Sequence, residues 1–176
     1  MASLARRPDC DITTVPGSYP RSGSGLTTSV AARLRGRTSY CLDGQVYTAA
    51  SAVRWMRDLG LVAGSREMDD AAGDDCAGVL FVPALAGLAA PWWRPDALAS
   101  LTGLSLATDR GHIVRAVIEG VAAQVADLAL VFGTDMGTAL RELRVDGGLT
   151  RSTVLMQATA DLLQVPVEVF PSAHAT

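Results

Sequence analysis

Apolar residues recur at helical spacing in three stretches of the chain. The longest of these predicts the central core helix, which begins after an N-cap at Thr108 or Asp109. Its apolar face is formed by Ile113, Val117, Val121, Val125, Leu128 and Phe132. A second helix is predicted between an N-cap at Thr48 and a C′ stop at Gly60. A third helical pattern begins at Val154 and repeats at Leu155, Ala158 and Leu162.

Shorter apolar runs predict strands between these helices. Residues 26–31 and 37–42 are β-like and are separated by Arg35 and Gly36, which predicts a hairpin. Residues 79–82 read as a buried strand that ends at Pro83. The segment 85–95 is rich in glycine, alanine, proline and tryptophan, and this composition favours an ordered loop that crosses the domain.

One turn near the carboxyl end combines a strand, an acid and two glycines before a helix. Residues 143–145 have strand character, Asp146 follows them, and Gly147 and Gly148 come next. Adjacent glycines permit positive φ and leave the main chain bare, so a nucleotide could approach the start of the helix. Residues 165–170 supply a further strand, which completes a β-turn-α-β unit typical of layered α/β domains. The alternative is that the glycine pair only closes the turn.

Composition narrows the classes of protein. The chain has 176 residues, of which 49% are hydrophobic and 19% charged, as expected for one globular domain. A net charge of -3 argues against nucleic acid and an anionic membrane surface as partners. The window taken as most apolar, residues 79–93, is interrupted by Pro83, Gly87 and Pro91 and is shorter than the roughly 20 residues of a membrane span, so no membrane segment is expected. All 15 basic residues are arginine, which excludes a Walker-type phosphate loop and a catalytic lysine.

Other reactive residues have structural interpretations. The three cysteines, Cys10, Cys41 and Cys76, match no zinc spacing and no disulfide framework, so a reduced, cytoplasmic setting is expected. The acidic residues between Asp69 and Asp75 lack the spacing of a calcium loop and predict a solvated surface loop. His112, in the first turn of the longest helix, is expected to cap or hydrogen-bond rather than act as a base.

Several motifs together resemble the FGGY carbohydrate kinases. Residues 99–104 and 112–119, separated by seven residues, are similar to the second signature of that family. Residues 81–84, 90–93 and 145–148 are similar to its glycerol kinase branch in particular. The resemblance covers about Gly25 to Thr176 and includes Leu155-Met156-Gln157.

This resemblance implies an α/β fold of the ribonuclease H-like (actin-like ATPase) type, with a mixed sheet and flanking helices. Residues 26–176 would form the C-terminal, nucleotide-binding domain, and residues 1–25 an irregular leader. The phosphate loop that the family carries before the hairpin is not found in 1–25, and a helix would be expected after Thr176. The domain is therefore expected to be truncated at both ends.

The implied reaction is direct transfer of the γ-phosphate of ATP, with Mg²⁺, to a hydroxyl of glycerol or a related polyol or sugar. The catalytic aspartate and the substrate-binding residues of such kinases belong to the other domain, so the isolated chain is expected to be inactive. A complementing N-terminal chain or a homo-oligomer are the partners to expect. Two alternatives remain: a catalytically silent nucleotide-binding or interaction module, and an α/β protein whose turn binds nothing.

The resemblance also implies site residues at the glycine turn. Gly148, with Gly147 beside it, would lie against the adenosine, and the family's polar residue four positions later falls on Ser152. Asp146 matches the acid of the turn and would orient the ligand or link to the metal.

Two further nucleotide positions fall on the helix after Thr48. Ala50 stands where glycerol kinases commonly have glycine, and Arg54 stands where they commonly have glutamine. An introduced cation at this position could meet a phosphate.

Overall fold

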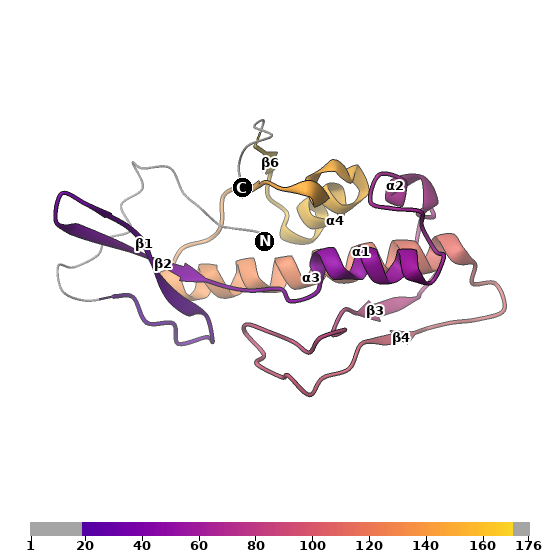
Figure 1. Cartoon of the computed structure of the whole chain (residues 1–176), viewed down its shortest axis with the longest axis horizontal. Helices are drawn as coiled ribbons and strands as arrows, with labels where there is room; N and C mark the ends of the chain where they lie inside the picture. Colours follow the sequence, from indigo (N-terminus) through magenta and orange to yellow (C-terminus); the bar gives the residue numbers. More distant parts are fainter. Residues whose placement is uncertain (1–18, 171–176) are drawn as a thin grey trace.

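The computed structural model describes residues 19–170, arranged around one long helix (Figure 1). Most of the predicted leader, Cys10 and the last six residues lie outside this range. The elements in chain order are β1 (Thr27–Leu34), β2 (Arg37–Asp43), α1 (Ala49–Asp58), α2 (Met68–Ala71), β3 (Leu80–Val82), β4 (Ser100–Thr102), α3 (Arg110–Met136), β5 (Leu143–Val145), the 3₁₀ turn η1 (Gly148–Arg151), α4 (Thr153–Leu163) and β6 (Val167–Val169).

The helix α3 is the structural axis. Asp109 caps it, as predicted, and accepts a hydrogen bond from the His112 backbone, while the His112 ring accepts one from the Asp109 backbone. The prediction of a single apolar face was too narrow, because Val114, Ile118, Ala122 and Ala129 are also buried. Apolar residues are needed on more than one side of α3, because β3 and α4 both contact it.

The same helix is long and apolar enough to cross a membrane by length and composition. Its most apolar window of 18 residues has a mean hydropathy of 1.6, and half of that window is buried within the fold. A core helix that is covered on several sides by its own domain passes the same test. The buried half of the window agrees with the position of α3 at the centre of the fold, although the expectation from residues 79–93 had not considered this helix.

The hairpin β1–β2 forms as predicted and extends beyond one end of α3 (Figure 1). Arg35 and Gly36 are its two turn residues and have φ values of 48° and 78°. Positive φ at both positions is the requirement of a type I′ turn, whose twist matches that of antiparallel strands.

The strand β3 pairs with β4 and packs against α3 through one face only. Phe81 is buried, whereas Leu80 and Val82 on either side of it are 65% and 44% exposed. The prediction of a buried strand over residues 79–82 is confirmed for Val79 and Phe81 and wrong for Leu80 and Val82, because a two-stranded ribbon lying on one helix has an uncovered outer face. Gly120 of α3 lets the ribbon approach closely, since a Cβ there would collide with the carbonyl oxygen of Phe81.

The predicted strand-turn-helix-strand unit is present at the carboxyl end. The strands β5 and β6 are parallel and joined through η1 and α4, with Leu143 opposite Val167. Leu155 and Ala158 of α4 are buried as predicted, whereas Leu162 is 52% exposed. Across residues 19–170 the strands form three separate two-stranded sheets rather than one mixed sheet.

The helix α1 packs its apolar side on α3, and Gly60 ends it with a φ of 73°. Trp55 lies at the edge of that side and stacks on Phe81, with ring centroids 5.6 Å apart. Thr48 is the N-cap residue, but its hydroxyl donates to the Pro83 carbonyl instead of accepting from the helix. The predicted side-chain cap is thus replaced by a tie between α1 and the loop after β3.

Candidate functional site

A cavity of about 400 Å³ lies between α1, α3 and the turn that follows β5. Five of the six residues that the sequence singled out line it: Ala50, Arg54, Asp146, Gly147 and Gly148. Its size is within the range of small-molecule sites, and its inner surface is largely apolar. Residues far apart in the sequence are therefore brought to one cavity.

The two glycines of the turn have different reasons to be glycine. Gly147 has φ 96° and ψ 178°, a conformation that is open to glycine almost alone. Gly148 has no such backbone requirement, because it lies in the 3₁₀ turn η1. A Cβ built on Gly148 would meet no described atom within 4 Å. Its missing side chain therefore leaves open space at the cavity wall.

Ser152 lies outside the cavity wall. It is 2% exposed, it caps α4 by accepting a hydrogen bond from the Leu155 backbone at 3.0 Å, and its hydroxyl donates to the carboxylate of Asp69. Both the acceptor and the donor capacity of the hydroxyl are thus used within the fold. The structure supports a helix-capping role for Ser152, and the cavity wall is formed by Gly147 to Thr150 before it and by Leu155, Met156 and Thr159 after it.

Asp69 occupies the position at which an anion would meet the start of α4. Its Oδ2 accepts hydrogen bonds from the Thr153 backbone at 2.7 Å and from the Thr153 hydroxyl at 2.8 Å. The expectation of a ligand at this helix start is corrected, because η1 separates the glycine pair from α4 and an internal carboxylate binds the free N–H groups. The prediction that Asp69 belongs to a merely solvated loop is corrected by the same contacts.

The ionisation of Asp69 follows from these contacts. Partial burial acts to raise the pKa of Asp69, but hydrogen bonds donated by Ser152, Thr153 and Val154 outweigh it. The pKa therefore lies below its ordinary value. Asp69 is a carboxylate at neutral pH, held by the start of α4.

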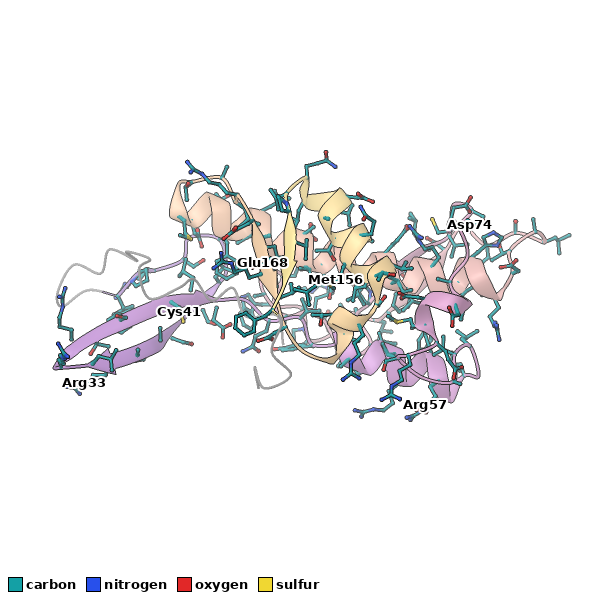
Figure 2. All side chains as sticks on the ribbon, turned by 90° about the horizontal axis from the view of Figure 1, so that it is seen from above. Arg33, Cys41, Arg57, Asp74, Met156 and Glu168 are labelled. Atoms are coloured by element: carbon teal, nitrogen blue, oxygen red, sulfur yellow. The ribbon has the colours of Figure 1, made fainter. Side chains whose placement is uncertain are left out.

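The α1 side of the cavity carries two arginines. Arg54 and Arg57 both line it, three residues apart on α1, with Ala50 one turn before Arg54. Arg57 donates to Asp58 from Nε at 3.1 Å and from Nη2 at 2.8 Å, and Figure 2 shows it on the outer side of α1. The rim is therefore cationic on the α1 side.

Asp146 contributes the opposite charge. It follows β5 directly, is partly buried, and is the one carboxylate in the cavity wall formed by residues 19–170. Within that range no group of three or more histidine, cysteine or acidic side chains is arranged to hold a metal ion. The cavity can therefore receive a ligand with an apolar part in its interior and polar or charged groups at its rim.

Several residues of the cavity wall were not predicted from the sequence. The missed residues include Arg57 and Ser65 at the rim, and Val121, Val125, Leu155, Met156 and Thr159 in the interior. Helical spacing from Arg54 would have indicated Arg57. The interior residues carried only a core signal, because the same apolar faces of α3 and α4 pack the domain and line the cavity.

Comparison of the sequence with known families gives one match across most of the chain. Residues 10–176 match the C-terminal domain of the FGGY family of carbohydrate kinases. Among curated relatives, a glycerol kinase of Trichlorobacter lovleyi is 48% identical over 149 residues, which is 83% of this chain and 30% of that protein. A glycerol kinase of Saccharopolyspora erythraea is 44% identical over 150 residues, with the same coverage. The chain thus spans about 30% of the length of these relatives.

Solved structures agree with the sequence matches. A Plasmodium falciparum glycerol kinase with ADP superimposes with a TM-score of 0.78 at 35% identity, over 87% of this chain and 31% of that one. A xylulose kinase from Brucella ovis gives a TM-score of 0.72 at 28% identity, over 88% of this chain and 32% of that one. These matches confirm the predicted actin-like ATPase fold. The chain belongs to the FGGY family of carbohydrate kinases and corresponds to its C-terminal domain.

Proposed function

We propose that this chain supplies the nucleotide-binding half of an ATP-dependent, glycerol kinase-like carbohydrate kinase. The observation that carries the proposal is Gly148, where neither the backbone conformation nor a neighbouring atom requires glycine. A flat nucleoside lying against the bare main chain would explain why glycine occupies this position. The solved relative that contains ADP supports a nucleotide as the occupant.

In this proposal the cavity residues position the nucleotide. Gly147 and Gly148 present main chain beside the adenosine, Ala50 lies opposite on α1, and Arg54 offers a cation to the phosphates. In-line phosphoryl transfer depends mainly on such positioning and on charge neutralisation. The acceptor would be a hydroxyl of glycerol or a related polyol or sugar.

The cavity residues could contribute one ligand to a bound Mg²⁺ ion. Magnesium in nucleotide sites is commonly held by one or two carboxylates together with phosphate oxygens. Asp146 is the carboxylate that the described part of the cavity offers. It would hold the ion, which neutralises phosphate charge when bound.

The remaining functions of the kinase belong, in this proposal, to the part of the longer relatives that lies outside the region matched by this chain. We propose that this region, as a complementing chain, supplies the substrate-binding residues and the carboxylate that accepts the hydroxyl proton. The working compartment is the cytoplasm, where Cys41 and Cys76 remain free thiols. The alternative, a silent nucleotide-binding module, has the same cavity but no transfer activity in any combination.

The test is a calorimetric titration of the purified chain with MgATP and MgADP. Gly148→Val should weaken binding at least about tenfold while leaving the thermal midpoint nearly unchanged, since its side chain enters open space. Gly23→Val is the control, because Gly23 also lacks positive φ and lies outside the cavity, and a Cβ there would meet only the Asp135 carboxylate at an ordinary contact distance of 3.9 Å. Equal affinity of Gly148→Val and the wild type would refute the assigned site. Phosphotransfer to glycerol after addition of an N-terminal kinase fragment would favour the enzyme over the silent module.

A further inference from the structure

Arg54 is a cation at the cavity rim without an internal partner in residues 19–170. It forms neither an ion pair nor a side-chain hydrogen bond with another residue of that range. Asp58, four residues later on α1, has the spacing of an ordinary helical partner. That carboxylate is bound instead by Arg57, through two nitrogens. Arg54 is thereby left available to a ligand.

The residues around Arg54 offer a cavity ligand few other charged groups, so the charge of Arg54 affects which ligand binds. The interior behind it is formed by apolar side chains, including Val53, Val121 and Leu155. The one carboxylate of the described cavity wall, Asp146, forms no ion pair with Arg54. A ligand with an apolar or aromatic body therefore fits the interior, and an anionic group on that ligand fits the α1 rim.

We propose that Arg54 is a specificity-determining residue, through which the cavity selects nucleoside phosphates over uncharged nucleosides. The inference rests on the proposed nucleotide-binding function and adds a charge preference to it. A neutral glutamine at this position could hydrogen-bond a nucleotide but would not distinguish strongly by charge. The planar guanidinium presents several donors to phosphate oxygens at once, and its charge strengthens each contact.

The experiment compares adenosine, ADP and ATP as ligands of the wild type and of Arg54→Gln. The wild type should bind ADP and ATP more tightly than adenosine. Arg54→Gln should lower the affinity for ADP and ATP about tenfold, a value at the low end for a charge-assisted contact because the site is solvent-screened. Its affinity for adenosine should change less than about twofold.

Two further variants separate charge from structure. Arg54→Lys retains the charge but not the planar set of donors, so its ADP affinity should lie between those of Arg54→Gln and the wild type. Arg66→Gln removes an exposed cation outside the cavity, in the loop that follows α1, and should leave all affinities unchanged. The ADP affinity of the wild type should also fall more steeply with salt than that of Arg54→Gln.

The outcomes distinguish this inference from the function on which it rests. If the wild type binds nucleotides but Arg54→Gln loses adenosine and ADP affinity equally, or loses neither, the charge selection is refuted alone. An ADP affinity of Arg54→Lys no higher than that of Arg54→Gln would also refute it. If the wild type binds neither adenosine nor ADP, the proposed function is refuted and the inference with it.

Discussion

Removing the carboxylate of Asp69 is the perturbation with the most defined structural consequence. Asp69 accepts hydrogen bonds from Ser152, from the Thr153 backbone and hydroxyl, and from the Val154 backbone at 3.4 Å. Asp69→Ala leaves the first N–H groups of α4 and the buried Ser152 hydroxyl without this acceptor. Loss of a helix cap costs about 1 kcal/mol, and an unsatisfied hydroxyl costs about another 1 kcal/mol. We expect the free energy of unfolding to fall by about 2 kcal/mol at pH 7.

The effect of Asp69→Ala has a defined pH dependence. The folded pKa of Asp69 lies below its unfolded value, since the hydrogen bonds outweigh the opposing effect of burial. A group of this kind stabilises the fold above its unfolded pKa, about 4 for an aspartate, and that stability is lost as the pH falls through the folded pKa. The difference between wild type and variant should therefore be complete at pH 7 and shrink below about pH 4.

Urea unfolding followed by tryptophan fluorescence would measure this difference at several pH values. Asp70→Ala is the matched control, because Asp70 is the exposed neighbour on the same short helix and none of the side-chain hydrogen bonds in residues 19–170 involves it. It should change the free energy of unfolding by less than about 0.5 kcal/mol. Equal destabilisation by both variants, or a difference that persists undiminished at pH 3, would refute the reasoning.

Three further outcomes follow from individual contacts. Gly147→Val should lower the free energy of unfolding by about 1 to 3 kcal/mol in urea titrations, because a side chain is placed in a conformation reserved for glycine; an unchanged midpoint would contradict this. Gly120→Ala should lower the free energy of unfolding by about 1 to 3 kcal/mol, because its Cβ would clash with the Phe81 carbonyl; a wild-type melting temperature would argue against that packing. Replacement of Leu80 and Val82 by threonine should reduce the binding of a hydrophobic dye and self-association in light scattering, since both side chains are exposed on β3; no change would exclude that face as their source.

Features with local signals were predictable from the sequence. The hairpin turn at Arg35 and Gly36, the Asp109 cap and the Gly60 stop each depend on residues a few positions apart. The parallel pairing of β5 and β6 follows from the single short helix between them. The family was also predictable, because its motifs preserve residue order and spacing.

Features set by distant contacts were not predictable. Ser152 and Asp69 lie 83 residues apart, and neither position signals that one would bond the other. An apolar run such as 79–82 has the same appearance whether one or both faces are covered, so the exposure of Leu80 and Val82 depends on the number of layers in the fold. The hydroxyl of Thr48 similarly bonds the Pro83 carbonyl, a partner 35 residues away.

The glycine pair shows why the two interpretations of the turn were both reasonable from the sequence. A glycine can serve the backbone or leave room for another molecule, and the sequence does not distinguish these uses. The structure separates them by position: Gly147 has the φ and ψ of a glycine-only conformation, whereas Gly148 has an ordinary φ and an open space where a Cβ would point. Closing the turn therefore explains Gly147 and leaves Gly148 unexplained. Comparing the valine variants at both positions would assign stability to the first and ligand affinity to the second, and a reversal of the two effects would show that the cavity wall has been misassigned.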